Sequence, residues 1–284
     1  MISAESQHER ETGVGEMKGN FGIIALDVDG TLLNDEHALV PEVKEAVREA
    51  AQAGAEIVLC TGRGPRAAMP IMEELGLAGT MIVHNGGATV SSSDSRVISQ
   101  FKLDSDKLKP FLETCRREGL QFDLNTAFDV MVEQLSEEAR AVYQHLNVQP
   151  VMLNSGDPLP DGLIKMSVFG QIEGIDRVQQ YWEGQAQTLQ IIRSGDYFID
   201  IQHPGASKGD ALKELALQRG MPRERIFSIG NYYNDISMLQ FAGLGIAMDN
   251  SPDAVKAAAD AVCGSNNEAG AAAALRQYVL GQPA

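Results

Sequence analysis

Two carboxylates two residues apart stand where a short apolar run ends. Residues Phe21 to Leu33 read FGIIALDVDGTLL, and the apolar run Ile23 to Leu26 is followed by Asp-Val-Asp-Gly, which places carboxylates at Asp27 and Asp29. An apolar run of this length bounded by glycine predicts a buried strand. Carboxylates at the end of a core strand cost free energy unless a metal ion or a reacting group uses them. Because side chains alternate along an extended chain, one of these carboxylates can attack a substrate while the other, on the same side, handles a proton.

This pattern has two simpler interpretations. An EF-hand calcium loop needs glycine at position six and glutamate at position twelve. Counted from Asp27, those positions hold Leu32 and Ala38, so the calcium interpretation fails. An ordinary acidic turn remains the simplest explanation of a bare Asp-x-Asp-Gly, and only the residues further along the chain argue against it.

Composition and charge limit the classes of function. The chain has 284 residues, 44% hydrophobic and 22% charged, which is typical of a globular protein with a full core and predicts two domains. The net charge of −16 argues against a nucleic-acid surface, which needs clustered lysine and arginine. Any phosphate pocket must therefore be made positive locally, by a lysine, by backbone amides or by a metal ion. No apolar run approaches the length of a membrane span, and no pattern predicts an oligomeric state.

The cysteines and the first residues bear on localisation. Cys60, Cys115 and Cys263 form no CxxC pair or disulfide framework, which favours a reducing, cytoplasmic compartment. Residues 1–19 are polar and lack an apolar core, so we expect a disordered N-terminal tail and not a signal peptide. Met17 is an alternative start of the native chain.

Strand and helix patterns alternate on both sides of a middle region. We expect strands at 23–26, 57–60 and 80–84, and helices at 41–53 and 65–75, then the same alternation from about residue 197 with a helix at 208–217 and strands at 225–229 and 245–248. This order predicts an α/β fold with a parallel sheet and right-handed crossovers. Residues 88–195 mix short alternating strands with helices and predict an inserted α+β domain, so the core comprises 20–87 and 196–284.

Further polar residues fall at predicted strand ends or helix starts of this α/β layer. They are Thr61 in a Thr-Gly-Arg turn, Lys208 at a helix start, and Asn231, Asn234 and Asp235 in Gly-Asn-Tyr-Tyr-Asn-Asp. Each is unremarkable alone: the turn is an ordinary loop, the lysine is usually solvated, and Asn-Asp before an apolar helix is usually a cap. In open α/β sheets, however, ligands bind at the carboxyl ends of the strands, where these residues are expected to meet.

Together these residues fit phosphoryl transfer to an aspartate. A carboxylate that takes the phosphoryl group divides a very slow hydrolysis into two easier steps. A divalent cation must offset its repulsion from the substrate, and Mg²⁺ suits a site made of oxygen atoms. A hydroxyl and an ammonium can hold the remaining phosphoryl oxygens, and a second acid must protonate the leaving oxygen and later deprotonate water.

On these residues, the chain from about 22 to 280 resembles a haloacid dehalogenase (HAD) superfamily phosphatase of the Cof type. DVDGTL at 27–32, Thr61 in CTGR, Lys208 in SKGDAL and GNYYND at 230–235 are similar to the four motifs of that family, in the same order. The resemblance implies a Rossmann-like parallel-sheet core and an inserted α+β cap domain of the C2 (class IIB) type. It also implies a Mg²⁺-dependent phosphatase that acts on small phosphorylated metabolites, such as sugar phosphates or phosphorylated cofactors.

The resemblance also implies a role for each matching residue. Asp27 is similar to the nucleophile and Asp29 to the general acid and base, whose backbone carbonyl ligates Mg²⁺. Thr61, Gly62 and Lys208 are similar to the phosphate-binding residues. The expected metal ligands are Asp27, Asp29, Asn231 and Asp235, and Asn234 helps to position the ion and its waters. Asn234 and Asn85 are also expected to contact the substrate. Asn85 fits a plain turn residue equally well.

Asn231 is the departure, because the family usually has aspartate there. An amide oxygen can coordinate a cation but brings no charge, and one unit of charge about 4 Å from a cation is worth up to about 4 kcal/mol at an effective dielectric constant near 20. We therefore expect a weaker Mg²⁺ site. Two alternative functions stay open: a phosphometabolite-binding protein with little turnover, and a phosphomutase. Candidate substrate contacts, each of which also fits a structural role, are Lys165, Arg193, Tyr197 and Phe128.

Overall fold

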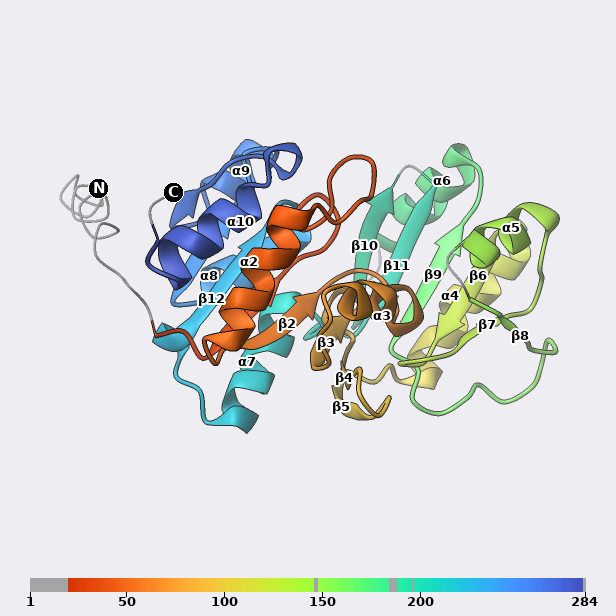
Figure 1. Cartoon of the computed structure of the whole chain (residues 1–284). Helices are drawn as coiled ribbons and strands as arrows, with labels where there is room; N and C mark the ends of the chain where they lie inside the picture. Colours follow the sequence, from red (N-terminus) through yellow and green to blue (C-terminus); the bar gives the residue numbers. More distant parts are fainter. Residues whose placement is uncertain (1–19, 146–147, 184–187, 196, 283–284) are drawn as a thin grey trace, which may run out of the picture. The chain divides into compact units, whose positions relative to one another are not determined.

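The structure, a computed structural model, describes residues 20–145, 148–183, 188–195 and 197–282. The expected tail at 1–19 lies outside these described residues. The chain forms two compact units (Figure 1). The first comprises the described parts of Met1–Thr61, Ile71–Thr80 and Ser207–Ala284, and the second comprises Gly62–Pro70 and Met81–Ala206. The sequence-based boundary at residue 88 stays a prediction.

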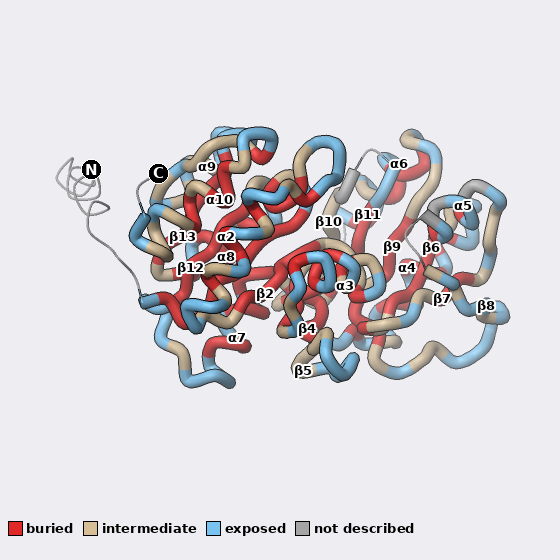
Figure 2. Tube along the Cα trace, in the orientation of Figure 1, coloured by how far each residue is buried: buried red, intermediate tan, exposed pale blue. Residues whose placement is uncertain are grey.

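The first unit is built on parallel strands that lie side by side in the order β14-β13-β12-β1-β2. Their bounds are β1 (Ile23–Leu26), β2 (Glu56–Cys60), β12 (Ile226–Gly230), β13 (Leu244–Ala247) and β14 (Ala261–Val262). β1, β12 and β13 are buried along their whole length, and Figure 2 draws them mostly in red. Leu26 pairs with Leu59 on one side and with Ile229 on the other, so these three strands end at the same edge of the sheet.

The helices of this unit follow the signals in the sequence. Their bounds are α2 (Pro41–Gln52), α7 (Lys208–Arg219), α8 (Ile236–Phe241), α9 (Asp253–Lys256) and α10 (Gly270–Ala274). In α2 the buried residues recur at helical spacing: Val43, Ala46, Val47 and Ala50. α7 begins after Ser207, whose hydroxyl accepts a hydrogen bond from Asp210 N at 3.0 Å, and ends at Gly220 in the left-handed conformation (φ +60°). α3 (Pro65–Glu74) contributes residues to both units.

The second unit contains a six-stranded sheet in the order β10-β11-β9-β6-β7-β8. Its strands are β6 (Gln121–Asn125), β7 (Val130–Val132), β8 (Val151–Met152), β9 (Lys165–Phe169), β10 (Gln190–Gly195) and β11 (Phe198–Gln202). Its helices are α4 (Ser105–Glu118), α5 (Glu137–His145) and α6 (Ile172–Glu183). β4 (Ala88–Ser91) and β5 (Val97–Gln100) form an antiparallel pair next to β3 (Thr80–Val83).

The two faces of the second sheet differ in chemistry. On one face, alternate residues of β6, β9 and β11 are apolar and pack with Leu108 of α4 and Trp182 of α6. On the other face, the strand register aligns residues in rows across β6, β9 and β11. The middle row is Asp123, Ser167 and Asp200, flanked by Asn125, Lys165 and Gln202 on one side and Gln121, Phe169 and Phe198 on the other. This alternation is typical of a sheet with only one apolar face.

The predicted α/β class with a parallel-sheet core and a second α+β region is confirmed. The prediction that the core pattern resumes at about residue 197 was wrong, because β11 pairs with β9 and β10 in the second sheet. Its sequence, FIDIQ, alternates apolar and polar residues, which is the pattern of a half-buried antiparallel strand. β8 was not predicted, since two exposed residues carry too little pattern. None of the described helices is long and apolar enough to cross a membrane.

Candidate active site

A buried lysine lies between two buried aspartates in the first unit. Lys208 Nζ donates a hydrogen bond to Asp27 Oδ1 at 2.7 Å and another to Asp235 Oδ1 at 2.6 Å. The exposed fractions are 1% for Lys208, 5% for Asp27 and 0% for Asp235. Charged groups at this depth are retained in proteins when they are paired and hydrogen-bonded, as these three are. The contacts join positions that are 181 and 27 residues apart in the sequence.

The environment moves the pKa values of this cluster. Burial, followed by repulsion from Asp235, raises the pKa of Asp27 to about 7, although the ammonium of Lys208 and the hydroxyl of Thr31 both act to lower it. Burial also acts to lower the pKa of Lys208, but the two carboxylates outweigh it and hold that pKa above its ordinary value. The lysine is therefore a fixed positive charge beside the carboxylate of Asp27.

The fold positions each member of the cluster at one edge of the sheet. Asp27 follows β1 directly, and its N–H donates to Ile229 O of β12 at 3.0 Å. Lys208 is the first residue of α7. Asp235 closes the loop after β12, because its Oδ2 accepts hydrogen bonds from Asn231 N and Tyr232 N, both at 2.9 Å. Its two carboxylate oxygens thus bind the ammonium and hold the loop.

Gly209, the residue after the lysine, lies directly against the start of α8. Its N–H donates to Ser237 Oγ at 3.0 Å, and a Cβ at Gly209 would collide with the backbone carbonyl of Ser237. The close approach of α7 and α8 therefore requires glycine at position 209.

The side-chain amide of Asn231 lies among oxygen atoms of the first motif. In one orientation its oxygen is 3.1 Å from Asp27 Oδ2 and 3.0 Å from the backbone carbonyl oxygen of Asp29, and it accepts from Thr31 Oγ1 at 3.3 Å. In the other orientation the amide nitrogen donates to the same Asp27 and Asp29 oxygens. Gly30, at φ +75°, packs against this amide, where a Cβ would collide with it. The amide can therefore present either an acceptor or a donor to the two oxygens.

This group of oxygens fits a small divalent cation. Mg²⁺ takes oxygen ligands in an octahedron at about 2.0–2.1 Å, which puts neighbouring ligands about 3 Å apart. The separations of 3.1 and 3.0 Å around the Asn231 amide match that spacing, and they equally match the hydrogen bonds that its nitrogen makes in the other orientation. The donors are of mixed kind, one carboxylate, one backbone carbonyl and one amide. Within the described residues, no group of three or more His, Cys, Asp or Glu side chains is arranged to hold a metal ion.

The side chain of Asp29 lies in a more open environment than that of Asp27. It is 46% exposed, and its Oδ1 is 3.9 Å from His37 Nδ1. A carboxyl group with this access to solvent can exchange protons with water, which the buried Asp27 carboxylate cannot do as readily.

The other predicted site residues divide between the two units. Thr61 is buried directly after β2, whose end lies beside that of β1. Asn234 is exposed on the turn Tyr233–Asp235. Gly62 and Asn85 lie together in the second unit, where a Cβ at Gly62 would be 3.0 Å from Asn85 Oδ1. Asn85 itself has φ +55°, a conformation that asparagine tolerates in turns.

Sequence reasoning did not single out three residues that border this cluster. Thr31 contacts Asn231, and His37 lies beside Asp29. Asn250 Nδ2 donates to Gly30 O at 2.9 Å and so ties the loop after β13 to the first motif. Thr31 stands inside DVDGTL and could have been found there, whereas Asn250 is 220 positions from its partner and carries no local signal.

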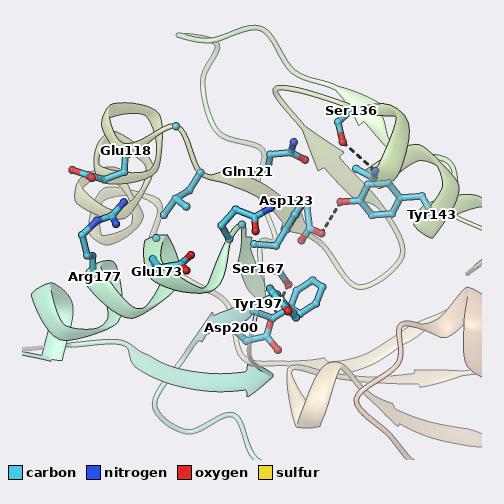
Figure 3. Close-up of a pocket in the computed structure, with 18 of the residues that line it drawn as sticks. Glu118, Gln121, Asp123, Ser136, Tyr143, Ser167, Glu173, Arg177, Tyr197 and Asp200 are labelled. Atoms are coloured by element: carbon cyan, nitrogen blue, oxygen red, sulfur yellow. Dashed lines mark hydrogen bonds between the residues drawn. The ribbon is translucent and has the colours of Figure 1, made fainter.

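The second unit holds a cavity of about 970 Å³ over the polar face of its sheet (Figure 3). The middle row of that face lies on its floor, Tyr143 and Ser136 lie at one end, and Glu118 and Arg177 lie at the other. Two of the candidate substrate contacts, Lys165 and Tyr197, line this cavity. The other two have structural partners: Arg193 binds Asp176 and Gln179, both at 2.8 Å, and Phe128 O accepts from Arg66 at 3.2 Å.

Comparison with known sequences places these residues in context. A family model for haloacid dehalogenase-like hydrolases matches residues 24–275. The phosphatase YwpJ of Bacillus subtilis (strain 168) is 29% identical over 290 residues, which cover 90% of this chain and 99% of YwpJ. The 5-amino-6-(5-phospho-D-ribitylamino)uracil phosphatase YcsE of the same organism is 29% identical over 258 residues, which cover 91% of this chain and 96% of YcsE.

Solved structures agree with the sequence comparison. A haloacid dehalogenase-like hydrolase from Bacteroides thetaiotaomicron has a TM-score of 0.80 at 27% identity, covering 90% of this chain and 99% of that one. The HAD subclass IIB sugar phosphatase BT4131 has a TM-score of 0.76 at 26% identity, covering 90% of this chain and 98% of that one. The similarity therefore extends over both units.

Proposed function

We propose a reaction from one premise, that this chain belongs to the haloacid dehalogenase-like hydrolase family and is a phosphatase. We infer that it hydrolyses small phosphorylated metabolites, either sugar phosphates or phosphorylated cofactors, through an aspartyl-phosphate intermediate on Asp27. The observation that carries this proposal is the buried Asp27–Lys208–Asp235 cluster at the edge of the sheet.

In the first step the carboxylate of Asp27 attacks phosphorus, the aspartyl P–O bond forms, and the bond to the leaving oxygen breaks. Lys208 holds a positive charge beside the attacking carboxylate, where negative charge gathers on the phosphoryl oxygens. The hydroxyl of Thr61 and the N–H of Gly62 supply further donors to those oxygens. Asp29 donates the proton that the leaving oxygen takes up.

In the second step water attacks the phosphorus of the aspartyl phosphate. Asp29, now ionised, takes a proton from this water, and inorganic phosphate leaves while the Asp27 carboxylate is regenerated. The 46% exposure of the Asp29 side chain supports this role, because both the leaving oxygen and the attacking water must be able to reach its carboxyl group.

We propose that Mg²⁺ is held by Asp27 Oδ2, the backbone carbonyl of Asp29 and the Asn231 oxygen. When bound, the ion would offset the repulsion between the anionic substrate and Asp27. Asp235 and Asn234, predicted to position the ion and its waters, stay in the proposal. The Asp235 carboxylate accepts hydrogen bonds from Lys208 Nζ and from the backbone N–H of Asn231, so it positions both of these residues. Asn85 stays a predicted substrate contact.

The relatives support small phosphorylated substrates. The name of YcsE gives a phosphorylated ribitylamino-uracil as its substrate, and the name of BT4131 describes a sugar phosphatase. The net charge of −16 supports a small molecule as the partner over nucleic acid. We assign the reaction to the cytoplasm, in keeping with three unpaired cysteines, of which Cys60 and Cys115 are buried.

The test measures release of inorganic phosphate from an aryl phosphate, with and without Mg²⁺, by the natural chain and by Asp27→Asn. We expect turnover that depends on Mg²⁺, loss of turnover in the variant, and a phosphoryl adduct on the Asp27 peptide after rapid acid quench. Asp253→Asn, an exposed aspartate in the first turn of α9, is the matched control. Isomerised ester without free phosphate would indicate a phosphomutase, and binding without turnover would indicate a phosphometabolite-binding protein; either result overturns the proposal.

A further inference from the structure

The loop that carries the first motif is tied to two other loops of the same unit by side-chain amides. Because β14, β13, β12 and β1 are parallel to one another, the loops that follow β13 and β14 leave the sheet at the same edge as residues 30–35. Three asparagines on these two loops reach residues 30–35: Asn250, Asn266 and Asn267. We call this set the asparagine clamp.

Two asparagines of the clamp contact backbone carbonyl oxygens of the loop and also contact each other. Asn250 Nδ2 donates to Gly30 O at 2.9 Å. Asn266 Nδ2 donates to Leu33 O at 3.2 Å. Asn266 N donates to Asn250 Oδ1 at 3.1 Å, which fixes the orientation of the Asn250 amide with its nitrogen toward Gly30. The two asparagines therefore hold the loop together.

At the other end of the clamp, amides hold a carboxylate. Asp35 Oδ1 accepts from Asn266 Nδ2 at 3.0 Å, and Asp35 Oδ2 accepts from Asn267 Nδ2 at 2.9 Å. Asp35 N donates in return to Asn267 Oδ1 at 3.1 Å. The hydrogen bonds from the two amides lower the pKa of Asp35, so its carboxylate is ionised and accepts both of them at neutral pH.

The contact at Gly30 bears directly on the candidate metal site. Gly30 stands between Asp29 and Thr31 at φ +75°, and a residue without a Cβ moves between backbone conformations more freely than any other. The hydrogen bond from Asn250 fixes the peptide group that follows Gly30. The peptide group that precedes Gly30 carries the Asp29 carbonyl, so the same hydrogen bond restricts the directions in which that carbonyl can point.

Burial separates the roles of the two central asparagines. Asn266 is 3% exposed and donates three hydrogen bonds within the clamp, so its loss should cost stability. Asn250 is exposed, and a surface side chain usually contributes less than about 0.5 kcal/mol to stability. Groups that orient the ligands of a metal ion nevertheless contribute about 10- to 100-fold to metal affinity or activity. Asn250 should therefore affect the site more than the fold.

We propose that Asn250 is a positioning residue for the phosphatase reaction and that Asn266 holds Asn250 in place. This inference rests on the proposed function, in which the Asp29 carbonyl holds Mg²⁺ and the Asp29 carboxyl group moves a proton. Asn250 acts on Asp29 through the peptide group of Gly30, and it does not itself bind the phosphoryl group or the metal ion.

The test compares the full natural chain with Asn250→Ala and Asn266→Ala by calorimetric titration of Mg²⁺, aryl phosphate turnover and urea unfolding. Asn250→Ala should weaken Mg²⁺ binding and lower kcat, each by about tenfold or more, and should leave the urea midpoint almost unchanged. Asn266→Ala should lower the urea midpoint more than Asn250→Ala does, because buried partners lose their donor. Asn154→Ala removes an exposed amide that donates to Asp157 in the second unit, and as the matched control it should change none of the three.

Hydrogen–deuterium exchange in EDTA adds a measurement that involves no metal ion. The backbone amides of residues 31–33, which all donate to Val28 O, should exchange faster in Asn250→Ala than in the natural chain.

Two results would overturn the inference alone. One is unchanged Mg²⁺ affinity, turnover and exchange in Asn250→Ala. The other is a set of losses in Asn250→Ala and Asn266→Ala that simply follows their losses of stability, since that would show a purely structural role. No release of phosphate by the natural chain would overturn the proposed function, and this inference with it.

Discussion

Both units place a lysine beside aspartates, but the two arrangements differ in how completely the charges are paired. In the first unit Lys208 Nζ lies 2.7 and 2.6 Å from two carboxylates, and its side chain is 1% exposed. In the second unit Lys165 Nζ lies 3.6 Å from Asp200, its side chain is 14% exposed, and a cavity adjoins it. The ammonium of the first cluster is hydrogen-bonded to both carboxylates, whereas the ammonium of the second cluster borders a cavity.

In the proposed reaction this difference would separate two tasks. A carboxylate that is to attack phosphorus must be held rigidly, which suits the charged, buried and close neighbours of Asp27. A surface that binds an organic group needs unsatisfied hydrogen-bonding capacity and space, so its neighbours are neutral donors and aromatic rings. Removing a partner should therefore cost far more stability in the first cluster than in the second.

The largest expected effect is that of Lys208→Met. It leaves Asp27 and Asp235 buried without their cation, so we expect the free energy of unfolding to fall by about 3–5 kcal/mol, the usual cost of breaking a buried ion pair. Phosphatase turnover should fall by about 10²-fold or more, because a positive group beside the transferring phosphoryl is lost. Urea unfolding and the aryl phosphate assay measure the two effects.

Two variants check the reason for this loss. Lys213→Met removes an exposed lysine of the same helix and should change stability by less than about 0.5 kcal/mol. Adding Asp235→Asn to Lys208→Met should recover part of the lost stability, because one of the two unpaired charges is removed. A stable single variant, or a double variant no better than the single one, would contradict the picture of a charge-paired cluster.

The next prediction concerns the side-chain amide at position 231. In Asn231→Asp the side chain can no longer donate to Asp27 Oδ2 and the Asp29 carbonyl, so we expect the chain without metal to lose about 1–2 kcal/mol of stability. With Mg²⁺ the added charge should raise affinity by about tenfold or more. Thermal unfolding in EDTA and in Mg²⁺, together with calorimetric titration of Mg²⁺, measures both.

Gln240→Glu is the matched control for Asn231→Asp, since it makes the same change of amide to carboxylate at an exposed position of α8. It should change stability and Mg²⁺ affinity much less. Equal Mg²⁺ affinity in the natural chain and in Asn231→Asp would refute the role given to the amide oxygen.

The last prediction concerns Tyr143 in the second unit, where only stability is expected to change. Burial raises the pKa of Asp123 above its ordinary value of 3.8, while Lys165 and the Tyr143 hydroxyl act to lower it. Removing the hydroxyl in Tyr143→Phe raises the pKa of Asp123 further. A carboxyl whose pKa is raised by folding favours the folded state while protonated, and that contribution is lost as the pH rises through the raised pKa. The variant should therefore be less stable than the natural chain by about 1–2 kcal/mol at pH 7, and by less near pH 4.

Unfolding by urea at the two pH values tests this dependence, with Tyr181→Phe as the control because half of that side chain is exposed. A stability loss that stays constant between the two pH values would show that Tyr143 acts through packing and not through Asp123.

The first unit could be predicted well because its information is local. Asp27 and Asp29 lie within one hexapeptide, and each further polar group stands at the end of an apolar strand or at the start of a helix. A parallel sheet brings strand ends to one edge, so Asp27, Lys208, Asn231 and Asp235 could be expected to meet before any coordinates were known. The contacts at 2.6 and 2.7 Å are those that this reasoning requires.

The second unit could be predicted only in outline. The floor of its cavity needs the register of three strands, and Asp123, Ser167 and Asp200 come from segments more than thirty residues apart. Each reads in the sequence as a lone polar residue in an alternating strand. The predicted return to the core at about residue 197 came too early for the same reason: the alternation in FIDIQ is that of a half-buried strand, but it does not say which strands are its neighbours.

Gly209 has a consequence that reaches beyond its own position. The carbonyl of Ser237 occupies the space that a methyl group at residue 209 would need, and the Gly209 N–H is bonded to the same serine. The absence of a side chain at residue 209 therefore allows α7 to approach α8 closely, with Lys208 at the start of α7. Alanine at 209 would push the start of α7 away from Ser237 and would so displace Lys208 from its two carboxylates, although residue 209 itself contacts neither of them.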